Sequence, residues 1–229
     1  RQLEPRAPEV VVRVETQPGE EMQVDFGYAG QMVDADSGNL RKAWAFVATL
    51  SWSRHQYVEF VFDQQVATWL RCHRNALEFF GGVPQRVVID NLKAAVNKVF
   101  SGKERSFNDR FLQLCSHYLY EPQACTPAAG WEKGQVENQV KTVRQRFFIP
   151  RPKVKDFGEL NALLLSRCIG WAKTRKHPTI PDKMVWEVYE EERAHLIPLQ
   201  LRFDGFAERP ARVSPSSLIT FDRNCYSVH

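Results

Sequence analysis

The stretch Trp131–Phe148, WEKGQVENQVKTVRQRFF, has the pattern of an amphipathic helix. Four apolar residues recur at spacings of four, three and four positions and form one stripe, namely Val136, Val140, Val143 and Phe147. Another face carries one acid within a row of cations, namely Lys133, Glu137, Lys141 and Arg144. One interpretation is a solvated face with a Glu137–Lys141 pair, worth a few tenths of a kcal/mol. The other is a metal-binding carboxylate among phosphate-binding cations, which requires further acids elsewhere in the chain.

Composition narrows the class of protein. The chain has 229 residues, of which 43% are hydrophobic and 25% charged, as in a soluble globular domain with an extension. No apolar run approaches the ~18 residues that a membrane span needs, and no signal peptide is visible. The chain opens at Arg1 rather than Met, so we expect a fragment of a longer protein. Its five cysteines are odd in number and lack CxxC spacing, which predicts reduced thiols and no zinc site.

The distribution of charge is more informative than the net charge of +4. Between Lys133 and Lys155 the sequence has seven Lys or Arg residues, and Glu137 is the only acid. Such a local excess favours a polyanionic partner, and no clean lipid-facing stripe accompanies it. We therefore expect nucleic acid rather than a membrane as the partner of this stretch.

The hydrophobic pattern predicts an α/β order of elements. Residues 21–28, 42–51 and 55–62 read as an antiparallel meander of three strands, followed by a helix over 63–80 that Asp63 caps and Gly81 ends. Residues 86–90 form a short apolar strand of the buried, parallel kind. A helix at 111–119, a strand at 120–125 and the helix quoted above complete the order β-β-β-α-β-α-β-α.

Two acids occupy unusual places in these elements. Asp25 stands in mid-strand, where Asp is disfavoured, on the side opposite Met22, Val24 and Phe26; the alternative is a solvent-facing Asp on a half-exposed sheet. Asp90 ends a parallel strand, where α/β sheets bind ligands; the alternative is an N-cap before a helix over 92–99. The acids of Asp34–Gly38 lack the pattern of a calcium loop and predict a hairpin turn.

Three local motifs surround the acids and resemble those of a known family. They are Gln23-Val-Asp25-Phe-Gly27, Val88-Ile-Asp90-Asn91-Leu-Lys93 and Lys133-Gly-Gln-Val-Glu137-Asn138. Together with the segments 126–130 and 175–181, they resemble the DDE transposase/integrase catalytic core of the RNase H-like superfamily, and more narrowly the IstA-type transposases of bacterial insertion sequences. The resemblance covers roughly residues 19–181. The gap of 47 positions between the second and third acids is longer than in the retroviral type.

The resemblance implies a fold, a division of the chain and a set of site residues. It implies a five-stranded mixed sheet flanked by helices at 19–150, after an arm at 1–18. A helical extension at 151–197 and the start of a small β-barrel at 198–229 follow, and there we expect helices at 156–173 and 181–195 and strands at 210–213 and 218–228. It implies that Asp25, Asp90 and Glu137 are catalytic and hold metal. DNA contacts are expected from Lys93, Lys133, Asn138, Lys141, Arg144 and Arg146.

Three carboxylates suit phosphodiester chemistry. Cleavage and strand transfer need a water or 3′-hydroxyl deprotonated and a leaving oxygen stabilised, and two Mg²⁺ ions about 3.5–4 Å apart can do both. Without metal, two like charges at 4 Å repel by about 4 kcal/mol at an effective dielectric of 20, so a converging cluster has little structural purpose. We therefore expect two Mg²⁺ ions, for which Mn²⁺ substitutes.

The resemblance also implies partners and a location. These are transposon-end and target DNA, a homo-oligomer of at least two copies and an IstB-type AAA+ ATPase helper, in the bacterial cytoplasm at the nucleoid and not in a membrane. Two alternatives stay open: another RNase H-like nuclease, such as a hybrid-cutting RNase or junction resolvase, and a catalytically inactive DNA-binding module descended from a transposase. A strand-transfer assay separates the first from the transposase, and metal binding the second.

Overall fold

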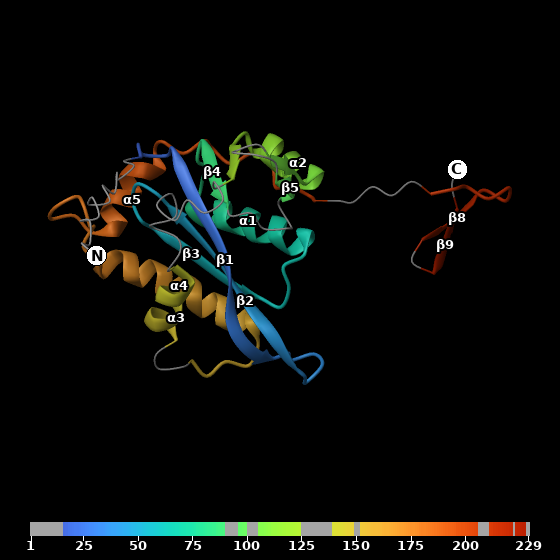
Figure 1. Ribbon diagram of the computed structural model, residues 1–229, viewed down its shortest axis with the longest axis horizontal. Helices are drawn as coiled ribbons and strands as arrows, with labels where there is room; N and C mark the ends of the chain where they lie inside the picture. Colours follow the sequence, from blue (N-terminus) through green and yellow to red (C-terminus); the bar gives the residue numbers. More distant parts are fainter. Residues whose placement is uncertain are drawn as a thin grey trace, which may run out of the picture.

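A computed structural model of the chain describes residues 16–89, 96–99, 105–124, 139–148, 152–205, 211–221 and 223–227 (Figure 1). Its strands are β1 (Glu21–Val33), β2 (Leu40–Leu50), β3 (Gln56–Val61), β4 (Arg86–Ile89), β5 (Val96–Val99), β6 (Arg105–Phe107), β7 (Glu121–Ala124), β8 (Leu218–Phe221) and β9 (Asn224–Ser227). Its helices are α1 (Val66–Phe80), α2 (Asp109–Tyr118), α3 (Gln139–Phe147), α4 (Phe157–Thr174) and α5 (Val185–Arg193). Residues 1–15 of the predicted arm lie outside the described residues.

The central sheet has the strand order β3-β2-β1-β4-β7. β1, β2 and β3 form the predicted antiparallel meander, and β4 and β7 are parallel additions beside β1. β1 is longer than predicted, and only its first four residues pair with β4, from Glu21 opposite Arg86 to Val24 opposite Ile89. The predicted core order β-β-β-α-β-α-β-α is confirmed, with β5 and β6 as an addition between β4 and α2. The fold is the predicted five-stranded mixed sheet flanked by helices.

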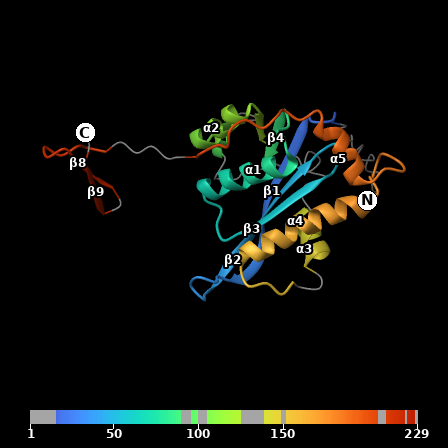
Figure 2. The same ribbon diagram turned by 180° about the vertical axis from the view of Figure 1, so that it is seen from behind.

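Helices cover both faces of the sheet, as the opposite views of Figures 1 and 2 show. Because side chains alternate along a strand, Met22 and Val24 join the core under α1 and α2, as predicted. Val47 and Ala45, the cross-strand partners of Asp25 and Gly27, belong to the second core under α3 and α4. Asp25 and Gly27 therefore share the α3 side of β1.

The outer edge of β3 is closed by a side chain of α4. The Asn161 amide accepts a hydrogen bond from the Phe60 backbone N–H at 2.8 Å and donates one to the Phe60 carbonyl at 3.0 Å. An edge strand otherwise presents unpaired backbone groups to other chains. This contact also fixes α4 against the sheet beside α3.

The first helix begins later than the sequence predicts. α1 starts at Val66 with Gln65 as its N-cap residue, so the prediction of a cap at Asp63 was wrong. The Asp63 carboxylate instead accepts from the Gln65 N–H, which makes a local turn ahead of the helix. The predicted end is confirmed, since Gly81 takes the left-handed conformation at φ 66°.

The segment after β4 contains a hairpin, and the alternative of a helix over 92–99 was wrong. Residues 96–99 form β5, which pairs antiparallel with β6. Val96 and Val99 are β-branched and favour a strand, and the pairing partner is local. The periodicity of so short a segment does not distinguish the two structures.

Past the core, both predicted helices are present, whereas the predicted strand at 218–228 is divided into two and residues 211–213 are not a strand. α4 begins after an N-cap at Asp156, as expected, whereas α5 is shorter than predicted and is preceded by Asp182 at φ 65°. The predicted strand at 218–228 is a hairpin of β8 and β9, turning at Arg223, which has φ 66°. Residues 211–213 are irregular. The turn between β8 and β9 lies inside a stretch with a strand-like sequence, and the sequence analysis did not recognise it as a turn.

Burial of two histidines predicts a loss of stability in acid. Burial lowers the pKa of His55 to about 3 and that of His73 to about 4. The unfolded chain binds these protons near pH 6.5, so stability is complete above that pH and falls as the pH drops towards 4. At pH 5 each histidine costs about 2 kcal/mol.

Urea unfolding at pH 7 and pH 5 checks this expectation. His55→Phe should remove about half of the difference, because His55 already lies among Phe79, Trp186 and Tyr189. His195→Gln, at an exposed position, should leave the difference unchanged. Equal pH dependence in the wild type and His55→Phe would contradict the assignment.

No helix in the described part of the chain is long and apolar enough to cross a membrane. The described cysteines Cys72, Cys115, Cys168 and Cys225 are free thiols, which agrees with the prediction for those four.

Candidate active site

Asp25 lies in the middle of β1, where the sheet changes from three antiparallel strands to parallel ones. It is half-buried and stands opposite Val47 of β2. The preceding residue, Val24, is opposite Ile89, the last residue of β4. The Asp25 side chain is therefore on the α3 side of the sheet, at the carboxyl end of the neighbouring parallel strand, where α/β sheets bind ligands.

Five of the predicted site residues lie outside the described part of the chain, namely Asp90, Lys93, Lys133, Glu137 and Asn138. The structure locates Asp25, Lys141, Arg144 and Arg146. Among the described residues no group of three or more His, Cys, Asp or Glu could hold a metal ion. The metal-binding set of three acids remains a prediction.

The helix that follows Glu137 in the chain is seated on β1 at Gly27. A Cβ built on Gly27 would stand 2.7 Å from Val140 Cγ2, closer than a carbon pair tolerates. Val143 and Phe147 are buried in the same core, which confirms the described part of the predicted apolar stripe. The first turn of α3 thus rests two residues along β1 from Asp25.

The predicted basic face divides into two groups. Lys141 and Arg144 are exposed to solvent on α3. Arg146 is instead held within the fold: its Nη1 donates to Gln56 Oε1 at 2.7 Å, and its guanidinium lies 3.9 Å from the centre of the Trp171 ring. Burial lowers the pKa of Arg146. Its present contacts anchor α3 to β3 and α4.

The predicted family segment at 175–181 has a structural role in this chain. His177 Nδ1 accepts hydrogen bonds from the backbone N–H groups of Thr179 and Ile180 at 3.3 and 3.0 Å. Its Nε2 therefore carries the proton and donates to the Trp52 carbonyl at 2.9 Å. The imidazole ties the α4–α5 connection to the turn between β2 and β3.

Two contributors to the site were missed by reasoning from the sequence. Gly27 had been assigned to a strand, but its role is to admit α3 close to the sheet. A glycine inside a strand signals such a close backbone approach, and that signal was available. The contact of Arg146 with Trp171 could not be read from spacing, because it joins residues of two different helices.

Comparison with known proteins agrees with this geometry. Residues 15–129 match the family described as "Integrase core domain". A transposase of Aminobacter aminovorans is 38% identical over 100% of this chain and 44% of its own length. The transposase of insertion sequence element IS21 of Pseudomonas aeruginosa is 33% identical over 95% of this chain and 55% of its own length. The chain thus spans about half the length of these relatives.

Similarity to solved structures concerns the fold. The catalytic core domain of HTLV-2 integrase, solved in complex with magnesium in a dimeric form, matches with a TM-score of 0.51 and 13% identity. The match covers 75% of this chain and 97% of that one. The sheet order and the position of Asp25 on β1 are consistent with the family match. The chain belongs to the integrase core domain family and has the RNase H-like fold.

Proposed function

We propose that this chain is the catalytic part of a DNA transposase that cleaves and joins the ends of an insertion sequence. The observation that carries the proposal is the seating of α3 on Gly27, beside Asp25. That contact brings the segment that follows Glu137 to the strand that carries Asp25. The relatives named as transposases support the substrate class.

The register of the sheet supports Asp90 as the second acid. Ile89 of β4 is the Cα partner of Val24, and Asp90 and Asp25 are the residues that follow them in the sequence. Consecutive Cα atoms are about 3.8 Å apart, so Asp90 begins within one residue of the end of β4. We propose that its carboxylate joins that of Asp25.

The helix geometry supports Glu137 as the third acid. Glu137 precedes Val140 by three positions, so on a continuous helix its side chain would point about 60° around the axis from that of Val140, between the apolar stripe and the face of Lys141. If the helical pattern of the sequence continues upstream of Gln139, Glu137 stands one turn before the Gly27 contact, on the Asp25 side. We propose carboxylate separations of about 4–8 Å, the spacing that a shared pair of metal ions requires. A structure with Mn²⁺ would test this, and a Glu137 carboxylate directed away from Asp25 would exclude it.

These acids fit a divalent metal ion, because carboxylate oxygens are the hard ligands that Mg²⁺ prefers. We propose two Mg²⁺ ions, replaceable by Mn²⁺, held by Asp25, Asp90 and Glu137. When bound, the ions would lower the pKa of the attacking hydroxyl and offset charge on the leaving oxygen. The rigid central strand fixes the Asp25 carboxylate, and the Gly27 seat fixes the helix that follows Glu137.

The cations of α3 are proposed to hold the phosphates that flank the cleavage point. Lys141 and Arg144 are exposed on the helix that leads away from Glu137, so they are placed for successive phosphates. Lys93, Lys133 and Asn138 are proposed contacts nearer the acids. Arg146 would first have to leave Gln56 and Trp171, so we propose that it orients α3 rather than binding DNA directly.

Changing both Lys141 and Arg144 to Ala is expected to weaken DNA binding for all sequences alike. Each lost phosphate contact should lower the salt slope by about 0.9, so the slope should fall by roughly 1–2 units. Titrations at several salt concentrations measure the slope. Arg202→Ala with Lys183→Ala removes the same charge from cations already paired with Glu78 and Glu191. An equal slope in the two double variants would exclude the proposed DNA path.

The proposal extends to the whole protein. We propose the division into an arm at 1–18, a core at 19–150, a helical extension at 151–197 and a β-domain from 198. A homo-oligomer pairing two ends, an IstB-type helper ATPase and a place at the bacterial nucleoid in the cytoplasm complete it. A strand-transfer assay with Mg²⁺ tests the activity: hydrolysis without joining would instead favour an RNase H-like nuclease.

A further inference from the structure

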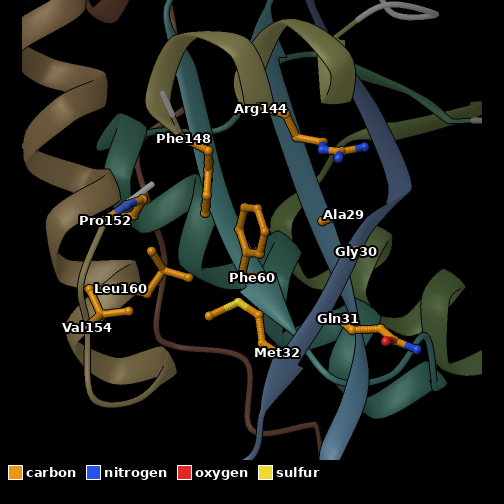
Figure 3. A pocket seen from close by; sticks show the side chains of 10 residues that line it. All are labelled: Ala29, Gly30, Gln31, Met32, Phe60, Arg144, Phe148, Pro152, Val154 and Leu160. Atoms are coloured by element: carbon orange, nitrogen blue, oxygen red, sulfur yellow. The ribbon is translucent and has the colours of Figure 1, made fainter. Parts of the chain in front are cut away.

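A pocket of about 250 Å³ opens on the α3 side of the sheet (Figure 3). Its larger apolar side chains come from β1, β3, α4 and the connection between α3 and α4, namely Met32, Phe60, Phe148, Pro152, Val154 and Leu160. Figure 3 shows the Phe60 ring at the centre of this lining, with Phe148 beside it and Met32 below. The two rings have centroids 4.8 Å apart and an interplanar angle of 30°. Phe60 is only 2% exposed, so the aromatic surface that the pocket presents is that of the half-buried Phe148.

The β1 wall of the pocket is main chain. The ladder with β2 shifts register between Tyr28 and Gly30, which leaves Ala29 without a partner on β2. A bulge of this kind frees backbone polar groups from the ladder. Gly30 has φ 117°, and a Cβ built on it would meet no atom within 4 Å, so the space above it is open. The wall thus offers backbone donors and acceptors beside the aromatic rings.

Among the ten lining residues only Arg144 is charged. Its side chain is exposed, and within the described residues its guanidinium has no ion pair or hydrogen bond. In Figure 3 it extends from α3 towards the β1 side of the pocket. A ligand that combines a flat heterocycle with an anionic group matches this lining, and a nucleotide is such a ligand.

The β1 wall of the pocket belongs to the same strand that carries Asp25. Ala29 follows Asp25 by four residues on β1, a distance of about 13 Å at the rise of a strand. This corresponds to about four nucleotides at the duplex rise of 3.4 Å per strand. α3 crosses the sheet at this level, from Val140 over Gly27 of β1 to Phe148 beside Phe60 of β3.

We propose that this pocket receives one unstacked base of the bound DNA strand, stacked on Phe148, with its phosphate on Arg144. The base lies about four nucleotides from the cleavage point. This inference rests on the proposed function, and it adds a contact that depends on the base to a path otherwise made of phosphate contacts.

The three methionines allow a direct test on this chain. With ¹³C-methyl methionine, deoxynucleoside 5′-monophosphates should shift the Met32 signal saturably and leave that of Met22, buried under α1, unchanged. The matching deoxynucleosides should bind about tenfold more weakly, since the charge-assisted contact is lost. Arg144→Gln should reduce monophosphate binding by the same factor.

Three outcomes of this titration would overturn the proposal. They are an unmoved Met32 methyl, an equal shift with inorganic phosphate alone, and equal affinity for nucleoside and monophosphate. The titration needs no metal and no cleavage, so its result is independent of the proposed catalytic function.

A second measurement identifies the base in DNA. The full-length protein is bound to a duplex end that carries 2-aminopurine at one position at a time. Fluorescence should rise at a single position about four nucleotides from the cleavage point. Val154→Trp, which fills the pocket, should abolish the rise while the salt slope of binding is retained. A rise at no position, or one that survives Val154→Trp, would overturn the proposal. If the fluorescence rises as expected but no cleavage is found, the base pocket is supported and only the proposed catalytic function is excluded.

Discussion

Replacing Asp25 with Asn is expected to abolish DNA cleavage and strand transfer, by about a thousandfold or more. The change is nearly isosteric and removes one anionic metal ligand, and metal stabilisation of the developing charge is worth several kcal/mol. Asp90→Asn and Glu137→Gln should have effects of the same size, because the three acids are proposed to act as one unit. Strand-transfer rates with saturating Mg²⁺ measure the loss.

The controls for Asp25→Asn separate catalysis from folding. Asp36→Asn changes an exposed acid in the β1–β2 turn and should retain full activity. The melting temperature of Asp25→Asn without metal should be unchanged or higher, since one charge leaves an acidic cluster. Near wild-type strand transfer by any one of the three variants would remove that acid from the site.

Replacing Gly27 with Ala is expected to reduce strand transfer about a hundredfold although no acid is altered. The new Cβ would meet Val140 at 2.7 Å, so α3 must move away from β1. A displacement of about 1 Å in a catalytic arrangement can cost 10²-fold in rate. Parallel measurements of strand transfer and of secondary structure by circular dichroism would show an inactive but folded enzyme.

A second substitution makes the mechanism of the Gly27 effect testable. Val140→Ala removes the methyl groups that the new Cβ meets, so the double variant should regain most of the activity. Gly170→Ala serves as the matched control, because a Cβ there meets nothing within 4 Å. Loss of activity in Gly27→Ala that Val140→Ala does not rescue would mean that the α3 seat is not the cause.

The order of strands and helices in the core could be read from periodicity because each element buries a face of its own. The alternation around Asp25 gave its side of the sheet, and apolar spacing gave the stripe of α3. Local chemistry was harder to read. The cap at Gln65 and the hairpin at 96–107 depend on turn geometry, which short runs of sequence do not specify.

The candidate site shows the same division. Aspartate is disfavoured in the middle of a strand, so the position of Asp25 was enough to identify it as a candidate site residue. The assignment of Arg146 to DNA depended on its position in a basic row, and nothing in that row predicts the Trp171 ring beneath it. The close approach of Gly27 and Val140 joins residues 113 positions apart, a contact that only folding reveals.

The amide of Asn161 has a consequence for how copies of this protein can associate. With both Phe60 backbone groups satisfied, a second copy cannot extend the sheet past β3 unless it first breaks two hydrogen bonds. A polar group that loses its hydrogen bond in a buried interface costs about 1–3 kcal/mol. Assembly through a continuous intermolecular sheet is therefore disfavoured on this flank, which protects the folded chain from strand-mediated aggregation there.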